Sequence, residues 1–474
     1  MLKGLQKFAR LKAGPVVGPY KIGFHGGALL ASVAMASLSF GAYAIAQSTP
    51  VVVERFRAPT HAAPLSTGIS AGTQTGARVT LKVLHSFGGN GDGARPYGSL
   101  IRDSEGNFYG TTSGGGASGY GTVFKLDTKG NETILVSFNG TNGKTPHSTL
   151  IQDAAGNLYG TTIFGGDLNC LNGLGCGVVF KIDTSGNETN LYTFTGAGGD
   201  GAVPTAGLTQ DTAGNLYGVT ADGGAAGFCV KFGGCGTVFR IDSSGNETVL
   251  YSFTGSKGDG TFPFGAVIVD ESGNIYGTTV SGGNHKGICE HNPEMGHGCG
   301  TVFMLDDTDH ETVLHRFSGV HGDGIAPSDQ LTMDSEGDLY GVTPYGGSRG
   351  QCGSIISTGC GTVFKIDASG AYTVLYRLHG RSDGAYPVGP LTLDSDGNLY
   401  GAAGSGGKYD YDGGLFELTA AGQLNVLFPF TDDEGEPTNP RGGLIQDAKD
   451  NIYGVTLSGG AYSNAGTVFE IRHR

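Results

Sequence analysis

The stretch LIQDAAGNLYGTT, residues 150–162, decides the fold, because its pattern returns along the whole chain after Thr80. Its Tyr-Gly step recurs with 50 to 64 residues between successive copies. The tyrosines of this step are Tyr109, Tyr159, Tyr217, Tyr276, Tyr340, Tyr400 and Tyr453. A period of this length indicates one supersecondary unit repeated along the chain. The structure predicted for one repeat therefore applies to every repeat.

Two further segments recur in the same order in each repeat. The first resembles GTVFKID, and its aromatic residues are Phe124, Phe180, Phe239, Phe303, Phe364, Phe416 and Phe469. The second resembles ETVLYSF and ends at Phe138, Phe194, Phe253, Phe317, Leu378 and Phe430. The last repeat stops at GTVFEIRHR without this second segment, and the missing copy stands at the front as TLKVLHSF, residues 80–87. The two ends of the chain are therefore predicted to complete one repeat together.

Each repeat predicts four short strands, A (GLTQD-like), B (NLYGTT-like), C (GTVFKID-like) and D (ETVLYSF-like). Tight turns such as DTAGN and DTSGN join A to B and C to D, since Asp and Asn bond their own backbone and Gly supplies positive φ. Four strands every 50–60 residues with recurrent aromatics are typical of a propeller blade. The sequence predicts an all-β, seven-bladed β-propeller over residues 80–474, its ring closed by an N-terminal strand that completes the last blade.

The recurring GNLYGTT, Gly-Gly, GTVFKID and TVLYSF elements closely resemble the GloVer-type choice-of-anchor tandem repeat of exported bacterial β-propeller proteins. The resemblance covers residues 80–474 and is specific, because all of its elements recur in order. It implies an exported bacterial propeller and no particular activity, since the relatives share no established one.

The N-terminal region supports export. Five basic residues precede the apolar stretch 27–46, which ends in Ala44-Ile45-Ala46. Residues 1–46 are therefore predicted to be a signal peptide, with an uncleaved N-terminal membrane anchor as the alternative. Residues 47–79 are Pro-, Ser-, Thr-, Ala- and Gly-rich and are predicted to be a disordered linker. We expect a periplasmic, extracellular or cell-surface protein, tethered to a membrane only if the N-terminus is not cleaved.

The charge of the chain limits its partners. The formal net charge is −14, and residues 47–474 hold 24 basic and 43 acidic side chains, a formal charge of −19. Such a surface repels nucleic acid and anionic lipid and favours cations or basic partners. We therefore expect no nucleic-acid partner, and we expect a monomer.

The eight cysteines fall into four pairs, each between the Gly-Gly after strand B and the Gly that opens strand C. In an exported protein this pattern predicts four local disulfides. The pairs are Cys170–Cys176, Cys229–Cys235, Cys289–Cys299 and Cys352–Cys360. The loop-entropy relation gives about 2.5 kcal/mol for closing each of these short loops.

The loop CEHNPEMGHGCGTVF, residues 289–303, also raises the question of a metal site. If Cys289 and Cys299 are bonded to each other, Glu290, His291, Glu294 and His297 remain as ligands, with His285 outside the bridge. The alternative is a solvated polar loop closed by a disulfide.

Propeller geometry sorts the loops into two faces. The A–B and C–D turns are short and uniform, whereas the B–C and D–A loops carry the length variation and all the cysteines, which predicts a binding surface on the second face. The D–A loop repeats a motif, DGARP in its first copy. Its leading residues are Asp92, Asn142, Asp200, Asp259, Asp323, Asp383 and Glu436. Six carboxylates at the central channel would suit Ca²⁺ or a cationic ligand. Turn formation by Asp-Gly-x-x-Pro is the structural alternative.

Two functions remain open from the sequence. The first is an exported, non-enzymatic binding or scaffold propeller that uses its variable, disulfide-braced face to bind a polysaccharide, protein or peptide, with no required cofactor. Tyrosines near that face could stack on sugars: Tyr97, Tyr345, Tyr386, Tyr409 and Tyr462. The second is a propeller enzyme, lyase, lactonase or glycosidase-like, at the mouth of the central channel. It would need a polar cluster that breaks the sevenfold repeat, for which Arg95 with Asp92, His147, and His321 with Asp323 are the seeds.

Overall fold

The computed structural model describes residues 79–88, 91–225, 229, 233–289, 298–347, 352, 359–380, 383–406, 412–431, 433, 435–462 and 464–473. The proposed leader and nearly all of the proposed linker lie outside these residues. The strand predicted to begin at Thr80 begins at Val79.

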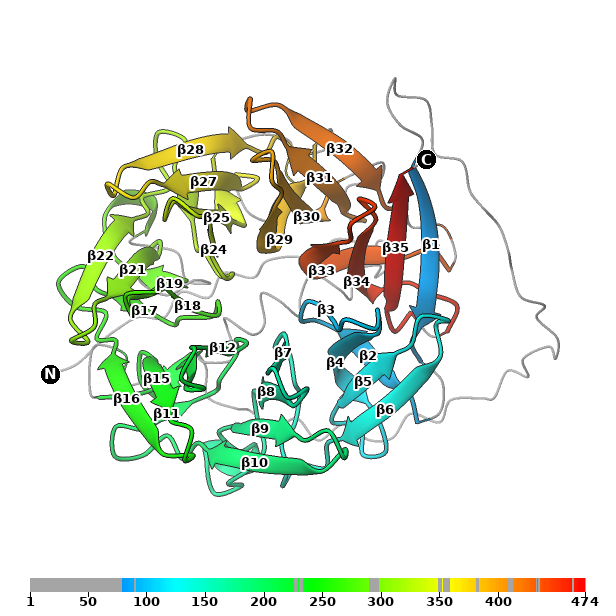
Figure 1. The fold of residues 1–474 in the computed structure, drawn as a ribbon. Coiled ribbons are helices and arrows are strands. Elements are labelled where there is room, and N and C mark those ends of the chain that lie inside the picture. Colours follow the sequence, from blue (N-terminus) through cyan, green and yellow to red (C-terminus); the bar gives the residue numbers. More distant parts are fainter. Residues whose placement is uncertain are drawn as a thin grey trace, which may run out of the picture.

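Seven antiparallel sheets stand around a closed ring, six of four strands and one, in blade 1, of five (Figure 1). Strand A of each blade lies innermost and strand D outermost. In the order A, B, C, D, blade 1 consists of β3 (Ile101–Arg102), β4 (Phe108–Gly115), β5 (Thr122–Leu126) and β6 (Glu132–Ser137), and blade 2 of β7 (Ile151–Gln152), β8 (Leu158–Thr162), β9 (Val178–Ile182) and β10 (Glu188–Thr193). Blade 3 consists of β12 (Thr209–Gln210), β13 (Leu216–Thr220), β15 (Thr237–Ile241) and β16 (Glu247–Ser252), and blade 4 of β18 (Ile268–Val269), β19 (Ile275–Thr279), β21 (Thr301–Leu305) and β22 (Glu311–Arg316).

Blades 5 to 7 follow the same order and close the ring. Blade 5 consists of β24 (Thr332–Met333), β25 (Leu339–Thr343), β27 (Thr362–Ile366) and β28 (Tyr372–Arg377). Blade 6 consists of β29 (Ala385–Leu393), β30 (Leu399–Ser405), β31 (Gly414–Leu418) and β32 (Leu424–Pro429). Blade 7 consists of β33 (Thr438–Gln446), β34 (Ile452–Ser458), β35 (Thr467–His473) and, as its strand D, β1 (Val79–Ser86). β1 pairs antiparallel with β35, from Val79 opposite His473 to Ser86 opposite Thr467. The predicted seven blades and the predicted closure are both confirmed.

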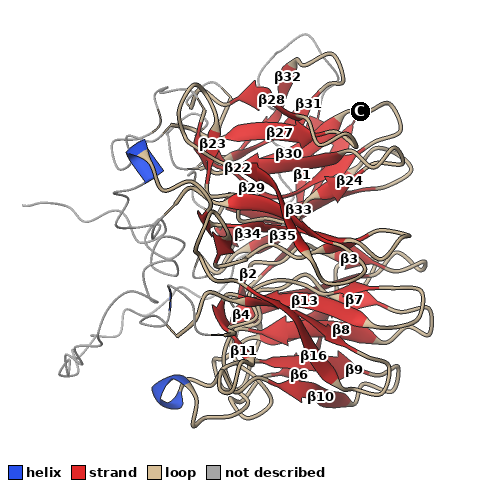
Figure 2. Cartoon of the chain, turned by 90° about the vertical axis from the view of Figure 1, so that its left-hand side faces the viewer, coloured by secondary structure: helices blue, strands red, loops and turns tan. Residues whose placement is uncertain are grey.

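Short ribbons cap the blades at one end. β2 (Gly93–Pro96) pairs with β4, and β11 (Gly201–Ala202), β17 (Gly260–Thr261) and β23 (Gly324–Ile325) pair with β14 (Asp222–Gly223), β20 (Ser281–Gly282) and β26 (Tyr345–Gly346). The 3₁₀ turns η1 (Leu171–Gly173) and η3 (Gly287–Cys289) lie in B–C connections. Both project from the face opposite the tight turns, as the predicted sorting of loops requires (Figure 2).

Aromatic pairs hold neighbouring blades together. The residue that ends strand D packs edge-to-face against the strand C phenylalanine of the next blade, with ring centroids 5.1 Å apart for Phe87 and Phe124. The other such pairs are Phe138–Phe180, Phe194–Phe239, Phe253–Phe303, Phe317–Phe364 and Phe430–Phe469. Between blades 5 and 6 Leu378 takes this place against Phe416. The core is thus a circuit of contacts between blades.

The tyrosine of each Tyr-Gly step has a polar role that the sequence analysis missed. In blade 2 the Tyr159 hydroxyl donates to Asp153 Oδ2 over 2.9 Å, and Asn157 donates to the same carboxylate. The spacing Asp, Asn four residues later, Tyr six residues later would have been the signal. The same hydroxyl-to-Asp bond recurs in every blade, at Tyr109, Tyr217, Tyr276, Tyr340, Tyr400 and Tyr453.

Candidate functional site

Each D–A loop is clamped to the B–C loop beside it by one backbone hydrogen bond. Val203 N–H donates to Cys176 O over 2.9 Å, and Pro204 follows at once. A Cβ on Gly177, which opens strand C, would lie 2.5 Å from Pro204 Cδ, so only glycine leaves room for the proline there. Equivalent bonds are donated by Arg95, Thr145, Phe262, Ala326, Tyr386 and Asn439.

The residue that donates this bond is held in left-handed backbone in every blade. Val203 has φ 62°, and the other six pre-proline residues have φ between 56° and 61°. This conformation is costly for a residue with a Cβ and most of all for a β-branched one, so the surrounding contacts must impose it. The clamp therefore fixes where the chain enters strand A.

The residue after the proline stands at seven equivalent places around the inner edge of the ring. These inner-edge positions hold Tyr97, His147, Thr205, Phe264, Ser328, Val388 and Arg441. No residue type occurs twice among them, although the proline before each and the clamp behind it repeat seven times. A uniform backbone scaffold that carries a diversified side chain in each blade is how binding surfaces on rigid folds are built.

Three of the inner-edge side chains form one stack across three blades. Tyr97 and His147 stack face to face, with ring centroids 4.4 Å apart and planes 10° apart. The Arg441 guanidinium carbon lies 5.6 Å from the Tyr97 ring centroid. Gly443 N–H donates to Ser99 Oγ over 2.6 Å, which ties blade 7 to blade 1 beside this stack. Cation, phenol and imidazole thus converge at one sector of the ring.

Charge is distributed unevenly around this edge. Burial lowers the pKa of His147 to about 4, and the positive charge of Arg441 adds to this effect. Burial raises the pKa of Asp329, which follows Ser328, while the Ser328 hydroxyl and Arg441 oppose that rise. At neutral pH the imidazole is therefore uncharged. The inner edge therefore presents hydrogen-bond donors and acceptors together with one cation, the Arg441 guanidinium.

Sequence reasoning named Tyr97 and His147 but missed Arg441 and Asp329. Of the other seeds, Arg95 forms the pre-proline clamp and His321 has φ 57° in its loop. Asp323 contacts His315, 3.4 Å away, and the Tyr372 hydroxyl, which donates to it over 2.8 Å. The signal for Arg441 was the diversity of the post-proline position.

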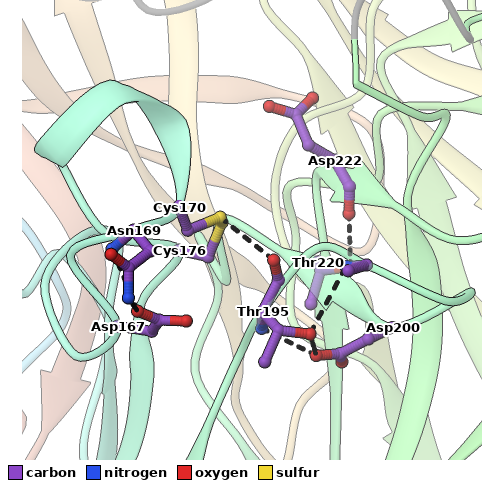
Figure 3. Close-up of a disulfide and its surroundings, with 9 residues drawn as sticks. Asp167, Asn169, Cys170, Cys176, Thr195, Asp200, Thr220 and Asp222 are labelled. Atoms are coloured by element: carbon purple, nitrogen blue, oxygen red, sulfur yellow. Dashed lines mark hydrogen bonds between the residues drawn. A yellow bond between two sulfur atoms is a disulfide. The ribbon is translucent and has the colours of Figure 1, made fainter.

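All four predicted disulfides are present, Cys170–Cys176, Cys229–Cys235, Cys289–Cys299 and Cys352–Cys360. Their half-cystines are largely buried in the clusters between blades. Figure 3 shows Cys170 beside Thr195, whose carbonyl oxygen lies 3.2 Å from its Sγ. The second cysteine of each pair supplies the carbonyl that accepts the pre-proline clamp, at Cys176, Cys235, Cys299 and Cys360. The disulfides therefore brace the support of the inner-edge positions.

Five of the six D–A loop acids accept hydrogen bonds within their own turn, Asp92 from Gly88 N–H among them. Thr195 donates to Asp200 through its N–H and its hydroxyl, over 2.7 and 2.6 Å (Figure 3). Thr254 and Ser318 do the same for Asp259 and Asp323. His379 N–H donates to Asp383, and Glu436 is partly buried. Within the described residues no group of three ligands unites any two of these six acids. The common ring of carboxylates suggested for Ca²⁺ is not formed, and the turn interpretation fits the geometry.

These acids lie at the outer rim instead, in what we call rim joints. A rim joint comprises the strand D residue two places before its closing residue, the loop acid, and the first residue of strand D in the next blade. At the joint between blades 2 and 3 these are Tyr192, Asp200 and Glu247. Burial, then the Asp200 charge, raise the pKa of Glu247 to about 7. Glu311 at the next joint behaves in the same way beside Asp259.

The metal ligands suggested in the loop 289–303 cannot be placed. Glu290, His291, Glu294 and His297 lie outside the described residues, as does Tyr409. His285 is described, and no metal-ligand group within the described ranges includes it.

The fold and its braced face define a class: a disulfide-bonded seven-bladed β-propeller, and four disulfides point to an exported protein. Within that class the chain belongs to the Gloeobacter/Verrucomicrobia repeat family, whose model matches residues 71–289 and 293–469. The resemblance drawn from the repeat is thereby confirmed. No curated protein matches the chain. No helix in the part of the chain that the structure describes is long and apolar enough to cross a membrane.

Similar solved structures include propellers of different kinds. An extracellular domain assigned to a hybrid two component system of B. thetaiotaomicron is 12% identical with TM-score 0.46, covering 80% of this chain and 39% of that one. A gluconolactonase of Xanthomonas campestris is 13% identical with TM-score 0.39, covering 87% and 99%. A surface component of the type-IX secretion system of Porphyromonas gingivalis is 16% identical with TM-score 0.46, covering 81% and 47%. The chain thus spans about two fifths of the first of these proteins, and no functional argument follows.

Proposed function

We propose that the protein is an exported, non-enzymatic binding propeller, and that its ligand is a neutral extracellular polysaccharide held at the inner edge of the disulfide-braced face. The observation that carries the proposal is the set of seven different inner-edge residues on one sevenfold-repeated support. A scaffold that repeats its clamp while varying the residue beside it is suited to recognition of an irregular ligand.

The chemistry of the inner edge favours a sugar. The edges of the Tyr97–His147 stack offer apolar surface and a hydroxyl, and Arg441 and Asp329 offer a donor and an acceptor for sugar hydroxyls. The negative charge of the chain disfavours polyanionic glycans, so a neutral one is the better partner. The ligand would sit outside the cell or in the periplasm, where the disulfides persist.

Calorimetric titration with the hexasaccharides of glucose, mannose and xylose tests this proposal. We expect one of them to bind, and Tyr97→Ala and Arg441→Ala to weaken binding by about tenfold or more, the usual loss at a central contact. Lys129→Ala, on the short-turn face, is the matched control and keeps full affinity. Unfolding temperatures of all variants check that the ring is intact. Binding that survives both inner-edge substitutions would contradict this location for the site.

One observation favours the enzyme alternative, a lyase, lactonase or glycosidase-like activity. His147 lies beside Arg441 and is held neutral, so its imidazole could hydrogen-bond a substrate, acting only as a weak base because its pKa is lowered to about 4, while the guanidinium stabilises an anion. Turnover of a lactone or of the same oligosaccharides, lost in His147→Ala, is the expected result for this alternative. Binding without turnover would leave the non-enzymatic proposal standing.

A further inference from the structure

The rim joint between blades 7 and 1 differs in its chemistry from the other six. It holds His85 from β1, Asp92 from the loop that follows, and Glu132, the first residue of β6. One ligand atom from each lies within 4.8 Å of the other two. Among the residues that the structure describes, this is the one group of three or more His, Cys, Asp or Glu side chains so arranged.

The three ligand atoms face one another across the joint, and no hydrogen bond joins His85 to either carboxylate. His85 Nε2 lies 3.4 Å from Asp92 Oδ2 and 3.8 Å from Glu132 Oε2. His85 Nε2 and Glu132 Oε1 are both buried, and within the described chain neither has a hydrogen-bond partner. Buried electron-pair donors at such distances repel each other unless a cation lies between them. The joint therefore requires either a shared proton or a metal ion.

The protein holds these ligands in place in advance. Gly88 N–H donates to Asp92 Oδ2 over 3.1 Å, and Gly93 N–H donates to Asp92 Oδ1 over 2.5 Å. The His85 ring packs edge-on against Phe87, with centroids 4.7 Å apart. Side chains oriented by such contacts lose little freedom when they take up an ion.

Two equivalent joints hold a tyrosine where this joint holds the histidine. Tyr192 and Tyr251 take the place of His85 beside Asp200 and Asp259. At the joint between blades 4 and 5 a histidine is present, but Tyr372 replaces the glutamate and donates its hydroxyl to Asp323. Histidine and two carboxylates occur together at blade 7 to blade 1 alone among these described joints.

We propose that His85, Asp92 and Glu132 bind one Zn²⁺ ion at the seam of the ring. One imidazole nitrogen and two carboxylate oxygens are ligands that Zn²⁺ takes in tetrahedral sites, with a water in the fourth position. Ca²⁺ prefers six to eight oxygens and suits the site poorly. The ion joins β1 to β6, so it fastens the first strand of the ring to the neighbouring blade.

The test is calorimetric titration of the full chain, stripped with EDTA, with ZnCl₂ alone. We expect a site of one ion per chain and an unfolding temperature that rises with zinc, because an ion that binds only the folded ring stabilises it. His85→Tyr, which copies the joint of Tyr192, and Glu132→Gln should each weaken this binding by about tenfold or more. His315→Tyr is the matched control and should bind zinc like the unaltered chain.

The outcomes separate clearly. Loss of the site in His85→Tyr and Glu132→Gln, but not in His315→Tyr, supports the proposal. Zinc binding that is unchanged in His85→Tyr overturns it and points to other histidines. Absence of binding at about 1 mM zinc, far above the Kd of a built site, leaves a proton as the occupant and also overturns it. Calcium binding that His85→Tyr abolishes, without zinc binding, overturns the choice of ion.

Discussion

The glycine of the Tyr-Gly step lies directly opposite the strand C phenylalanine of its own blade. Gly110 pairs with Phe124 in the ladder of β4 and β5, and a Cβ at Gly110 would lie 2.7 Å from Phe124 Cζ. The same approach, 2.5 to 2.7 Å, recurs at Gly160, Gly218, Gly277, Gly341, Gly401 and Gly454. Because the glycine has no side chain, the aromatic ring of the phenylalanine can fill the space above it. This explains why the Tyr-Gly step and the strand C phenylalanine repeat together.

Gly110→Ala should destabilise the protein by about 1–3 kcal/mol, the usual cost of overpacking a filled core. Gly114→Ala in the same strand is the matched control, because its Cβ would meet nothing closer than 3.7 Å. Chemical denaturation of the two variants measures the difference. Equal stability of both would mean that the ring of Phe124 moves aside at no cost.

Where neighbouring blades meet, some rim joints place two partly buried carboxylates side by side, and their charges repel each other. Glu311 opens β22, and its Oε1 is buried without a hydrogen-bond partner among the described residues. Burial, then the Asp259 charge, raise its pKa to about 7. The folded chain thus binds this proton more tightly than the unfolded chain does. The joint is most stable when Glu311 is protonated.

Glu311→Gln should therefore flatten the pH dependence of stability. In the unaltered chain this group's contribution is fully present below its ordinary pKa near 4.5 and declines as pH rises through about 7. We expect the variant to be more stable than the parent at pH 8 and to lose the advantage at pH 4. Urea denaturation across this range measures it, with Glu271→Gln, at an exposed turn position, correcting for net charge. A parallel shift of both curves would contradict the role assigned to Glu311.

At the scale of the whole molecule, β1 closes the ring by pairing with β35 and by placing Phe87 on Phe124. Removal of residues 79–87 should leave the outer edge of β35 unpaired and the core beside Phe124 open. We expect such a chain to lose its single cooperative thermal transition and to associate through the bare edge.

A synthetic peptide of residues 79–88, added in trans, should restore the transition, and the same peptide with Phe87→Ala should not. Differential scanning calorimetry and light scattering follow both effects. A truncated chain that melts like the intact one would show that the seam contributes nothing to the ring.

The fold could be predicted from the sequence because its determinants are local and repeated seven times. Tyr159, Phe180 and Phe194 mark strands by position, and the displaced copy at 80–87 reveals the closure. The site could not be predicted to the same depth. Arg441 and His147 are far apart in sequence and become neighbours of Tyr97 only when the ring brings blades 7, 1 and 2 together. His85 and Glu132 meet for the same reason. Asp92, Asp200 and Asp259 each lie beside a glutamate of the next blade, and they differ in the strand D residue of the preceding blade, which is His85, Tyr192 and Tyr251 respectively.

The seam has a consequence for the order of events during synthesis. β1 is synthesised before every other strand of the ring, whereas its partner β35 is the last strand of the ring to be synthesised. Val79 can therefore pair with His473 only after all the other strands have been made. Until β35 has been synthesised, β1 lacks the strand that it pairs with in the folded ring. Completion of the propeller therefore depends on its last strand: a chain that stops before β35 cannot close the ring, and β1 stays without its partner.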